Sequence, residues 1–221
     1  MPAYVVDTWI ANRPGRGAVL QRYLSMRKLK HLFTTSTLFL ARLDRQEDLR
    51  EGRWPAGVEA LLFDQPVDQE QLRRRLEDER HRTYTSCWTM RREICSDLFE
   101  AYGATDGAAV LVTVESLLAA LSDAEADLAL GGVRYVDHVD DDWVRRHPRV
   151  NTLVLPFQKR TAWEWEQEVR VVHQVTTAEP LDHVAVPIRL DRLEATVVPG
   201  PTCDREALED LVGGLAQVRL G

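Results

Sequence analysis

The sequence predicts a single α+β domain whose sheet is mainly antiparallel or mixed and is flanked by helices. The chain has 221 residues, of which 44% are hydrophobic and 29% charged, and this composition suits one compact domain rather than a disordered or fibrous chain. Short β-type segments and amphipathic helices follow one another without the strict alternation of a doubly wound parallel sheet. Residues 1–221 are therefore expected to form one domain, which ends in a helix within 201–221 that packs on the rest.

The first half of the chain opens with a β-type segment and a basic amphipathic helix. Residues 19–25 are expected to form a strand, and the helix after it would bury apolar side chains from Met26 to Phe33. Further along, the pattern predicts a strand over 38–41, a surface helix over 65–82 rich in ion pairs, a strand over 83–88 and a helix over 93–102 that is capped by Gly103.

The second half contains the most apolar strand and most of the remaining sheet. The continuous apolar run 108–114 predicts a fully buried strand, and 115–121 a helix after it. Four further strands are expected over 133–136, 166–175, 183–189 and 195–198. Thr202 is expected to be the N-cap of the last helix, whose apolar face would include Leu208, Leu211, Val212 and Leu215.

Charge and cysteine content narrow the class of protein. The net charge of −7 argues against binding nucleic acid over the whole surface, although residues 1–50 carry nine Lys/Arg against four Asp/Glu. That basic region either faces an anionic ligand or is an ordinary solvated surface. Three cysteines without a C-x-x-C pair indicate no disulfide framework or thiolate zinc site. The N-terminus lacks a secretory pattern and the apolar stretch 108–121 is too short for a bilayer, so a cytoplasmic protein without a membrane partner is expected.

The most informative segment is a row of acidic residues near residue 165. If residues 163–172 are extended, Glu164, Glu166 and Glu168 lie on one face and Trp163 and Trp165 face the core. Carboxylates two residues apart on a strand are separated by about 6–7 Å, a spacing that lets one stabilise positive charge while the other orients a nucleophile. The alternative is a strand with one solvated face, where Arg170 partly compensates the three acids.

Several short motifs, in their order along the chain, resemble a widespread uncharacterised bacterial domain family. They include the S-C-W strand at 86–88, the helix that ends at Tyr102-Gly103, and a W-x-x-E-x-E-x-R box over 163–170. The stretches 20–23 and 39–52 and Lys159 also fit this pattern. The resemblance covers about residues 19–200 and implies a family-like core without an established activity.

A second resemblance is to ADP-ribosyltransferases, which carry a basic residue, a Ser/Thr strand and an E-x-E strand in that order. Arg22, Ser86 and Glu166–Gln167–Glu168 match this order, although Thr85-Ser86-Cys87 departs from the full S-T-S pattern. The resemblance implies that NAD is the substrate, that Arg22 meets its phosphate or ribose, and that Ser86 holds the nicotinamide ribose. Glu168 would then stabilise the oxocarbenium ion while Glu166 orients the acceptor.

The remaining candidates complete this hypothesis. Tyr23, Trp88 or Tyr102 would stack on nicotinamide, and Lys159 and Arg170 are further cofactor-binding candidates. Lys159 either binds phosphate, as Arg160 could, or belongs with it to the basic last turn of a helix. The expected partners are a small-molecule nucleotide and an acceptor macromolecule, either protein or nucleic acid. The resemblance places such an enzyme in phage defence or toxin–antitoxin conflict.

Two other functions stay open at this point. The basic N-terminal fifty residues are compatible with a non-catalytic module that binds a protein or a nucleic acid. A metal-dependent nuclease is the third hypothesis, although its strand would be expected to read E-x-K. The acidic run 137–142 is interpreted as a loop rather than a metal site, and Cys87 as a structural thiol, so no metal is expected.

Overall fold

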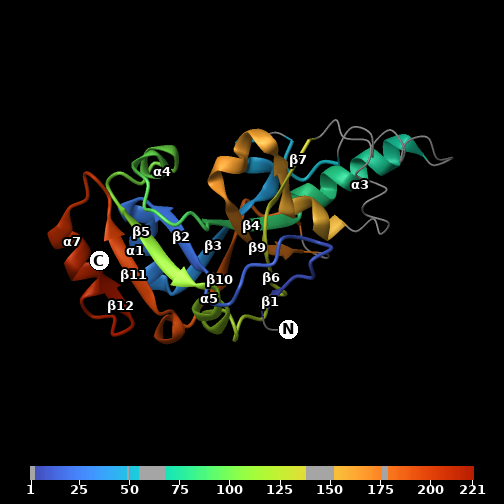
Figure 1. Ribbon diagram of the computed structural model, residues 1–221. Coiled ribbons are helices and arrows are strands. Elements are labelled where there is room, and N and C mark those ends of the chain that lie inside the picture. The colour runs from blue at the N-terminus through green and yellow to red at the C-terminus, as the bar shows by residue number, and fades with distance from the viewer. Residues whose placement is uncertain (1–2, 49, 55–67, 138–151, 176–178) are drawn as a thin grey trace.

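The computed structural model describes residues 3–48, 50–54, 68–137, 152–175 and 179–221. It confirms a single α+β domain built on a ten-stranded mixed sheet, with a second, two-stranded sheet beside it. Figure 1 shows α7 (Arg205–Val212) and α3 (Gln69–His81) at opposite ends of the molecule, with the large sheet running between them.

The large sheet is antiparallel at most of its pairings. Its main path runs β1-β6-β9-β4-β2-β5-β11-β12, while β3 pairs with β4 and with β10 off this path. Only the β1–β6 and β11–β12 pairs are parallel within this sheet. The strands are β1 (Tyr4–Val5), β2 (Val19–Leu24), β3 (Thr37–Arg42), β4 (Thr83–Thr89), β5 (Ala108–Thr113), β6 (Ala129–Gly132), β9 (Glu168–Gln174), β10 (His183–Pro187), β11 (Ala195–Pro199) and β12 (Val218–Leu220). The small sheet pairs β7 (Arg134–Val136) with β8 (Gln158–Arg160) in parallel.

The helices cover the sheet through apolar faces. Leu29, Leu32 and Phe33 are the buried residues of α1 (Met26–Thr35), as the helical spacing predicts. Within the described residues, the other α-helices are α4 (Ser96–Ala101) and α5 (Val114–Ala120), and the 3₁₀-helices are η1 (Leu43–Arg45), η2 (Thr152–Phe157), η3 (Thr161–Glu166) and η4 (Leu190–Arg192). The main core includes the buried faces of α1, α5 and α7 and of β2, β5 and β11, where Val110 and Val197 are completely buried, whereas α4 packs in a separate cluster with Tyr23 and Ala109.

A fork in the sheet positions the site described below. Strand β2 is paired with β5 along its whole length but meets β4 only at Gln21 and Thr89. The other end of β4 pairs with β3 through Thr85 and Tyr84. Because β2 and β4 diverge from their single shared position, the sheet opens between them, and α1 joins β2 to β3 beside the opening.

One sequence prediction that matters for function is wrong. Residues 163–167 are not extended: they belong to η3 and to the turn after it, where Gln167 has a left-handed backbone with φ of 45°. Strand β9 begins only at Glu168. The three glutamates therefore do not form one row, and Trp165, which is 42% exposed, does not face the core. Alternation along a strand predicts faces only while the backbone stays extended.

Other boundaries differ by smaller amounts. Helix α4 begins at Ser96 rather than 93, and its end at Tyr102 is followed by Gly103 in the left-handed conformation that a C-cap favours. The C-terminal helix is shorter than predicted, because its N-cap is Asp204 rather than Thr202 and the chain continues into the edge strand β12. Strands β1, β6, β8 and β12 are too short or too irregular in pattern to be predicted from periodicity.

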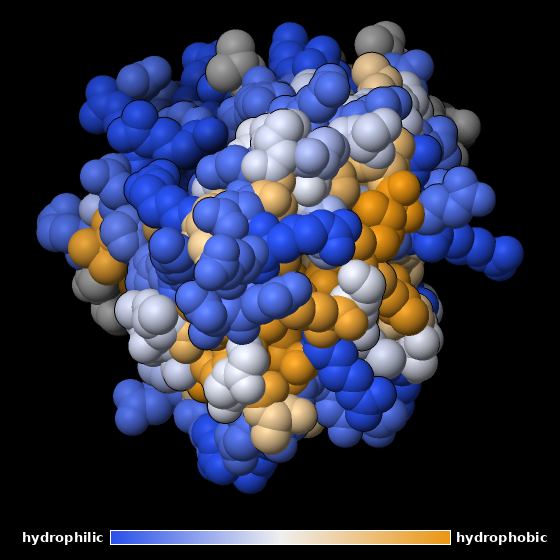
Figure 2. Space-filling model, turned by 90° about the vertical axis from the view of Figure 1, so that its left-hand side faces the viewer, coloured by the Kyte–Doolittle hydropathy of each residue, from blue (hydrophilic) through white to orange (hydrophobic). Residues whose placement is uncertain are grey.

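The face at the end that carries α7 is mostly hydrophilic (Figure 2). Seen from the end that carries α7, an apolar area crosses a surface dominated by polar and charged residues (Figure 2). Among the described residues, no helix combines the length and the apolar character that crossing a membrane requires.

Candidate functional site

The fork between β2 and β4 contains a pocket of about 380 Å³. This volume lies within the range of small-molecule binding pockets. Strands β2, β3 and β4, helix α1 and the residue after α4 supply most of its wall. The lining residues are Gln21, Arg22, Tyr23, Leu24, Arg27, Lys28, His31, Leu32, Thr37, Phe39, Ala41, Gln46, Thr85, Cys87, Trp88, Thr89 and Tyr102.

One side of the pocket is cationic. Helix α1 contributes Arg27, Lys28 and His31, at positions i, i+1 and i+4 on one side of the helix. Arg22 lies on the adjoining strand β2. Neither Asp nor Glu occurs among the described residues that line the pocket. A wall with positively charged side chains and without carboxylates attracts anions.

Arg22 is held in place by two contacts inside this wall. Its Nη2 donates a hydrogen bond to the carbonyl oxygen of Phe39 at 2.9 Å, and its guanidinium carbon lies 5.7 Å from the ring centre of Trp88. Burial lowers the pKa of Arg22 to about 10, so the side chain keeps its charge at neutral pH. Arg22 is therefore a positioned cation with donors that the Phe39 carbonyl does not use.

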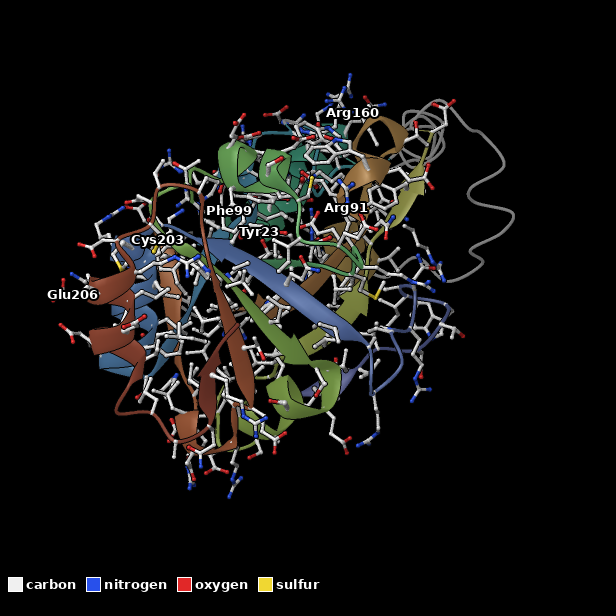
Figure 3. The ribbon with its side chains drawn as sticks, turned by 60° about the vertical axis from the view of Figure 1, so that its left-hand side comes forward. Tyr23, Arg91, Phe99, Arg160, Cys203 and Glu206 are labelled. Carbon is white, nitrogen blue, oxygen red and sulfur yellow. The ribbon has the colours of Figure 1, made fainter. Side chains whose placement is uncertain are left out.

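Aromatic side chains form another part of the wall. The Tyr23 ring lies 4.7 Å from Phe99 in an edge-to-face arrangement and 6.3 Å from Tyr102, and Figure 3 shows Tyr23 beside Phe99 below α4. The Tyr23 hydroxyl donates to Gln21 Oε1 at 2.8 Å and accepts from the Cys95 amide at 3.2 Å. These contacts fix the ring of Tyr23, which provides a rigid apolar surface next to polar groups.

Cys87 and Tyr102 form the back wall of the pocket, which borders a group of buried ionisable side chains. The Cys87 thiol lies near the Glu168 carboxylate, and the Tyr102 hydroxyl lies near Glu166. Burial, followed by these nearby carboxylates, raises the pKa of both Cys87 and Tyr102, so both groups stay protonated at neutral pH. Two wall residues thus separate the pocket from the two glutamates that the sequence singles out.

Five charged side chains lie behind this wall, and we call them the buried ion cluster: Glu51, Lys159, Glu166, Glu168 and Arg170. Lys159 Nζ lies 2.6 Å from Glu166, 3.3 Å from Glu168 and 3.3 Å from Glu51. Arg170 binds both oxygens of Glu168 at 2.9 Å and approaches Glu51 at 2.8 Å. Nη1 of Arg170 donates a hydrogen bond to the carbonyl oxygen of Pro156 at 2.7 Å. Every member is more than nine-tenths buried.

The pKa values of the carboxyl groups in the cluster diverge. Burial by itself raises the pKa of Glu168, but the charges of Arg170 and Lys159 outweigh burial and lower this pKa to about 2. Burial raises the pKa of both Glu51 and Glu166. The contacts of Glu51 with Arg170 and Lys159, and of Glu166 with Lys159, offset this effect of burial only in part. Lys159 has its pKa raised by the three carboxylates despite its burial. Glu168 is thus ionised in the folded protein at neutral pH.

Four of the residues predicted as ligand contacts line one pocket: Arg22, Tyr23, Trp88 and Tyr102. Ser86, also predicted to hold the ligand, is buried outside the lining and accepts a hydrogen bond from Trp88 Nε1 at 3.1 Å.

The other predicted residues lie behind the pocket wall. Glu166, Glu168, Lys159 and Arg170 bind one another in the buried ion cluster, and none of them is a lining residue. The acids are therefore neither a solvated face nor open to the pocket in this conformation. Trp163 also contacts the buried ion cluster, because Lys159 Nζ lies 4.6 Å from the centre of its ring in a cation–π arrangement.

Sequence reasoning missed Glu51, and it predicted a basic helix and a basic N-terminal region without singling out Arg27, Lys28 or His31 as site residues. Arg27, Lys28 and His31 have a helical spacing that was available as a signal, because positions i, i+1 and i+4 share one side of a helix. Glu51 offered no such signal, since its partners Lys159 and Arg170 are more than 100 residues away along the chain.

Comparisons of the chain with models of known protein families, with curated proteins and with solved structures find no match. Among the residues that the structure describes, no group of three or more His, Cys, Asp or Glu is arranged to hold a metal ion. Of the acidic run 137–142, only Asp137 lies within the described residues.

Proposed function

We propose that this protein binds a nucleotide in the pocket at the β2–β4 fork. The observation that carries the proposal is the pairing of three cationic side chains, Arg22, Arg27 and Lys28, with aromatic walls in one cavity of small-molecule size. Phosphates require the cations, and a planar ring requires the apolar faces of residues such as Trp88 and Tyr23. NAD is the first candidate, because the Arg22, Ser86 and Glu168 strands are neighbours in the sheet, in the order β2-β4-β9.

We further propose that the reaction, if NAD binds, is transfer of ADP-ribose. The bond between nicotinamide and ribose C1′ would break with its electrons leaving on nicotinamide, and an acceptor heteroatom would bond to C1′ and release a proton. The proximity of the wall residues Cys87 and Tyr102 to Glu168 and Glu166, whose charges raise the pKa of both wall residues, supports a role for these carboxylates. Glu168 would have to exchange part of its bonding to Arg170 and Lys159 for contact with the ribose.

A non-catalytic binding module is the second candidate. The burial of Glu166 and Glu168 and their pairing with cations favour it, because a carboxylate sealed behind a pocket wall is a structural group. In that case the pocket binds its nucleotide without chemical change. Binding and turnover therefore have to be measured separately.

The binding proposal predicts that Arg22→Gln weakens nucleotide affinity by about ten- to hundredfold, the effect of losing a hydrogen bond between charged groups. Lys28→Gln should also weaken binding, and higher salt should weaken it in the unmodified protein. The measurement is titration calorimetry with NAD, ADP-ribose and AMP.

Lys30→Gln is the matched control, because Lys30 is an exposed cation of the same helix that does not line the pocket. Its affinity should stay within about twofold of the unmodified protein, since an exposed charge contributes little. Equal weakening by Lys28→Gln and Lys30→Gln would indicate general charge attraction and count against this pocket. Absence of binding by all three nucleotides contradicts the proposal.

The transfer proposal predicts that Glu168→Gln lowers NAD turnover by about 10²–10³-fold, the usual effect of removing a group that stabilises transition-state charge. Labelled NAD is incubated with the purified protein and lysate, and released nicotinamide and transferred label are measured. Glu164→Gln, at an exposed position of η3 four residues before Glu168, should keep full turnover.

Thermal unfolding of both variants separates lost chemistry from lost folding. Turnover that survives in a folded Glu168→Gln variant contradicts the assigned role of Glu168. Binding without turnover by the unmodified protein favours the non-catalytic module.

A further inference from the structure

The buried ion cluster contains more carboxylates than cations. Three carboxylates, Glu51, Glu166 and Glu168, face two cations, Lys159 and Arg170, and all five are between 0% and 7% exposed. If every group were ionised, the cluster would carry one uncompensated negative charge away from solvent. An unpaired buried charge is so costly that the group normally changes its protonation state instead.

Neighbouring elements do not supply a third cation to these carboxylates within the described part of the chain. Arg160 of β8 is engaged by Asp48, at 2.8 and 3.0 Å. The other titratable groups facing the cluster are Cys87 of β4, Tyr102 after α4 and Tyr135 of β7, and all of them are neutral when protonated. The Tyr135 hydroxyl accepts the amide hydrogen of Glu168 at 2.8 Å.

The geometry also indicates which carboxylates receive the fewest hydrogen bonds and ion pairs. Glu168 receives two hydrogen bonds from Arg170 and one from Lys159. Glu51 Oε2 lies 2.8 Å from Arg170 Nη2 but has no well-aligned hydrogen bond, although it is buried. Glu166 has Lys159 at 2.6 Å on one oxygen and the Tyr102 hydroxyl as a further neighbour.

From this geometry we propose that the buried ion cluster stores one proton at neutral pH, shared by the Glu51 and Glu166 carboxylates. Lys159 Nζ contacts both carboxylates and thus joins them. Tyr102 lies near Glu166 and also lines the pocket, so this side chain stands between the stored proton and a bound ligand. The pair is a neutral-pH proton donor for the site, and the proton count does not depend on which ligand the pocket binds.

Infrared spectroscopy of the ligand-free protein in D₂O tests the proposal. At pH 7 exposed Asp and Glu are ionised, so a carboxylic acid C=O absorption reports a buried protonated acid. We expect this absorption in the folded protein and its loss on unfolding at the same pH. A folded protein without it overturns the proposal, whatever the result of the nucleotide experiments.

Two substitutions assign the absorption. Glu51→Gln and Glu166→Gln each leave two carboxylates with two cations, so each should abolish the absorption. Glu164→Gln, on the exposed side of η3, should retain it. An absorption that persists in both cluster variants belongs to another acid and overturns the assignment, and either variant suffices if the other does not fold.

The pH dependence of unfolding gives an independent measurement. A folded state that holds an extra proton loses stability as the pH rises above the pKa of a free glutamate, until the pH exceeds the pKa of the folded group. In this window one bound proton changes the unfolding constant by up to about tenfold per pH unit. This contribution should be missing from Glu51→Gln or Glu166→Gln, and a slope equal to that of the unmodified protein contradicts the proposal.

Discussion

Replacing Arg170 with methionine is expected to lower the free energy of unfolding by about 3–5 kcal/mol, the cost typical of removing one partner from a buried ion pair. Arg170 is completely buried, and it is the bidentate partner of Glu168 and the nearest cation to Glu51 Oε2. Methionine fills much of the same volume, so the loss comes chiefly from unpaired carboxylates. Denaturant unfolding at pH 7 measures it.

Arg192→Met is the matched control for this substitution. Arg192 also has a carboxylate partner, Asp123 at 3.3 Å, but its side chain is 44% exposed. Solvent screens such a pair, so we expect a loss of at most about 1 kcal/mol. Similar losses for the two variants would mean that burial of the cluster contributes little to its strength.

Acidification is expected to remove about 3 kcal/mol of stability through Glu168 alone, between the pKa of a free glutamate and about pH 2. The pKa of Glu168 is lowered to about 2 in the folded protein, because Arg170 and Lys159 outweigh the effect of burial. In this window the unfolded chain binds a proton that the folded chain excludes, so stability falls as the pH falls. Denaturant unfolding at a series of pH values from 6 to 2.5 follows this loss.

The Arg170→Met variant separates the Glu168 contribution from that of other carboxylates. Without Arg170, burial dominates and the pKa of Glu168 should no longer be lowered, so the variant should lose less stability than the unmodified protein over the same pH range. Arg192→Met should keep the loss attributable to Glu168. Parallel pH profiles for the unmodified protein and Arg170→Met would contradict this role of the Arg170–Glu168 pair.

Much of the fold follows from local patterns. The apolar run that forms β5 and the spacing of Leu29, Leu32 and Phe33 on α1 identify a buried strand and a half-buried helix without further information. Gly103 marks the end of α4 because its left-handed backbone favours glycine. These features depend on residues within a few positions of one another.

The site was only partly predictable. The resemblance to ADP-ribosyltransferases implied ligand contacts at Arg22, Tyr23, Trp88 and Tyr102, and all four line the pocket, although ligand binding itself stays a prediction. The acidic segment was interpreted as an extended strand, but η3 and the left-handed Gln167 turn the chain before β9. A short 3₁₀-helix has no periodicity that distinguishes it from a strand in such a sequence.

The amino-acid sequence by itself determined the α+β class, the amphipathic faces and most strand positions, because these depend on side chains spaced two to four residues apart. Only the tertiary structure decided that β2 and β4 diverge around a pocket and that Glu51 meets Arg170 across more than 100 residues. A charged residue looks the same in a sequence whether water or another charge surrounds it. Its burial depends on which distant segments pack together, and that packing is a property of the whole chain.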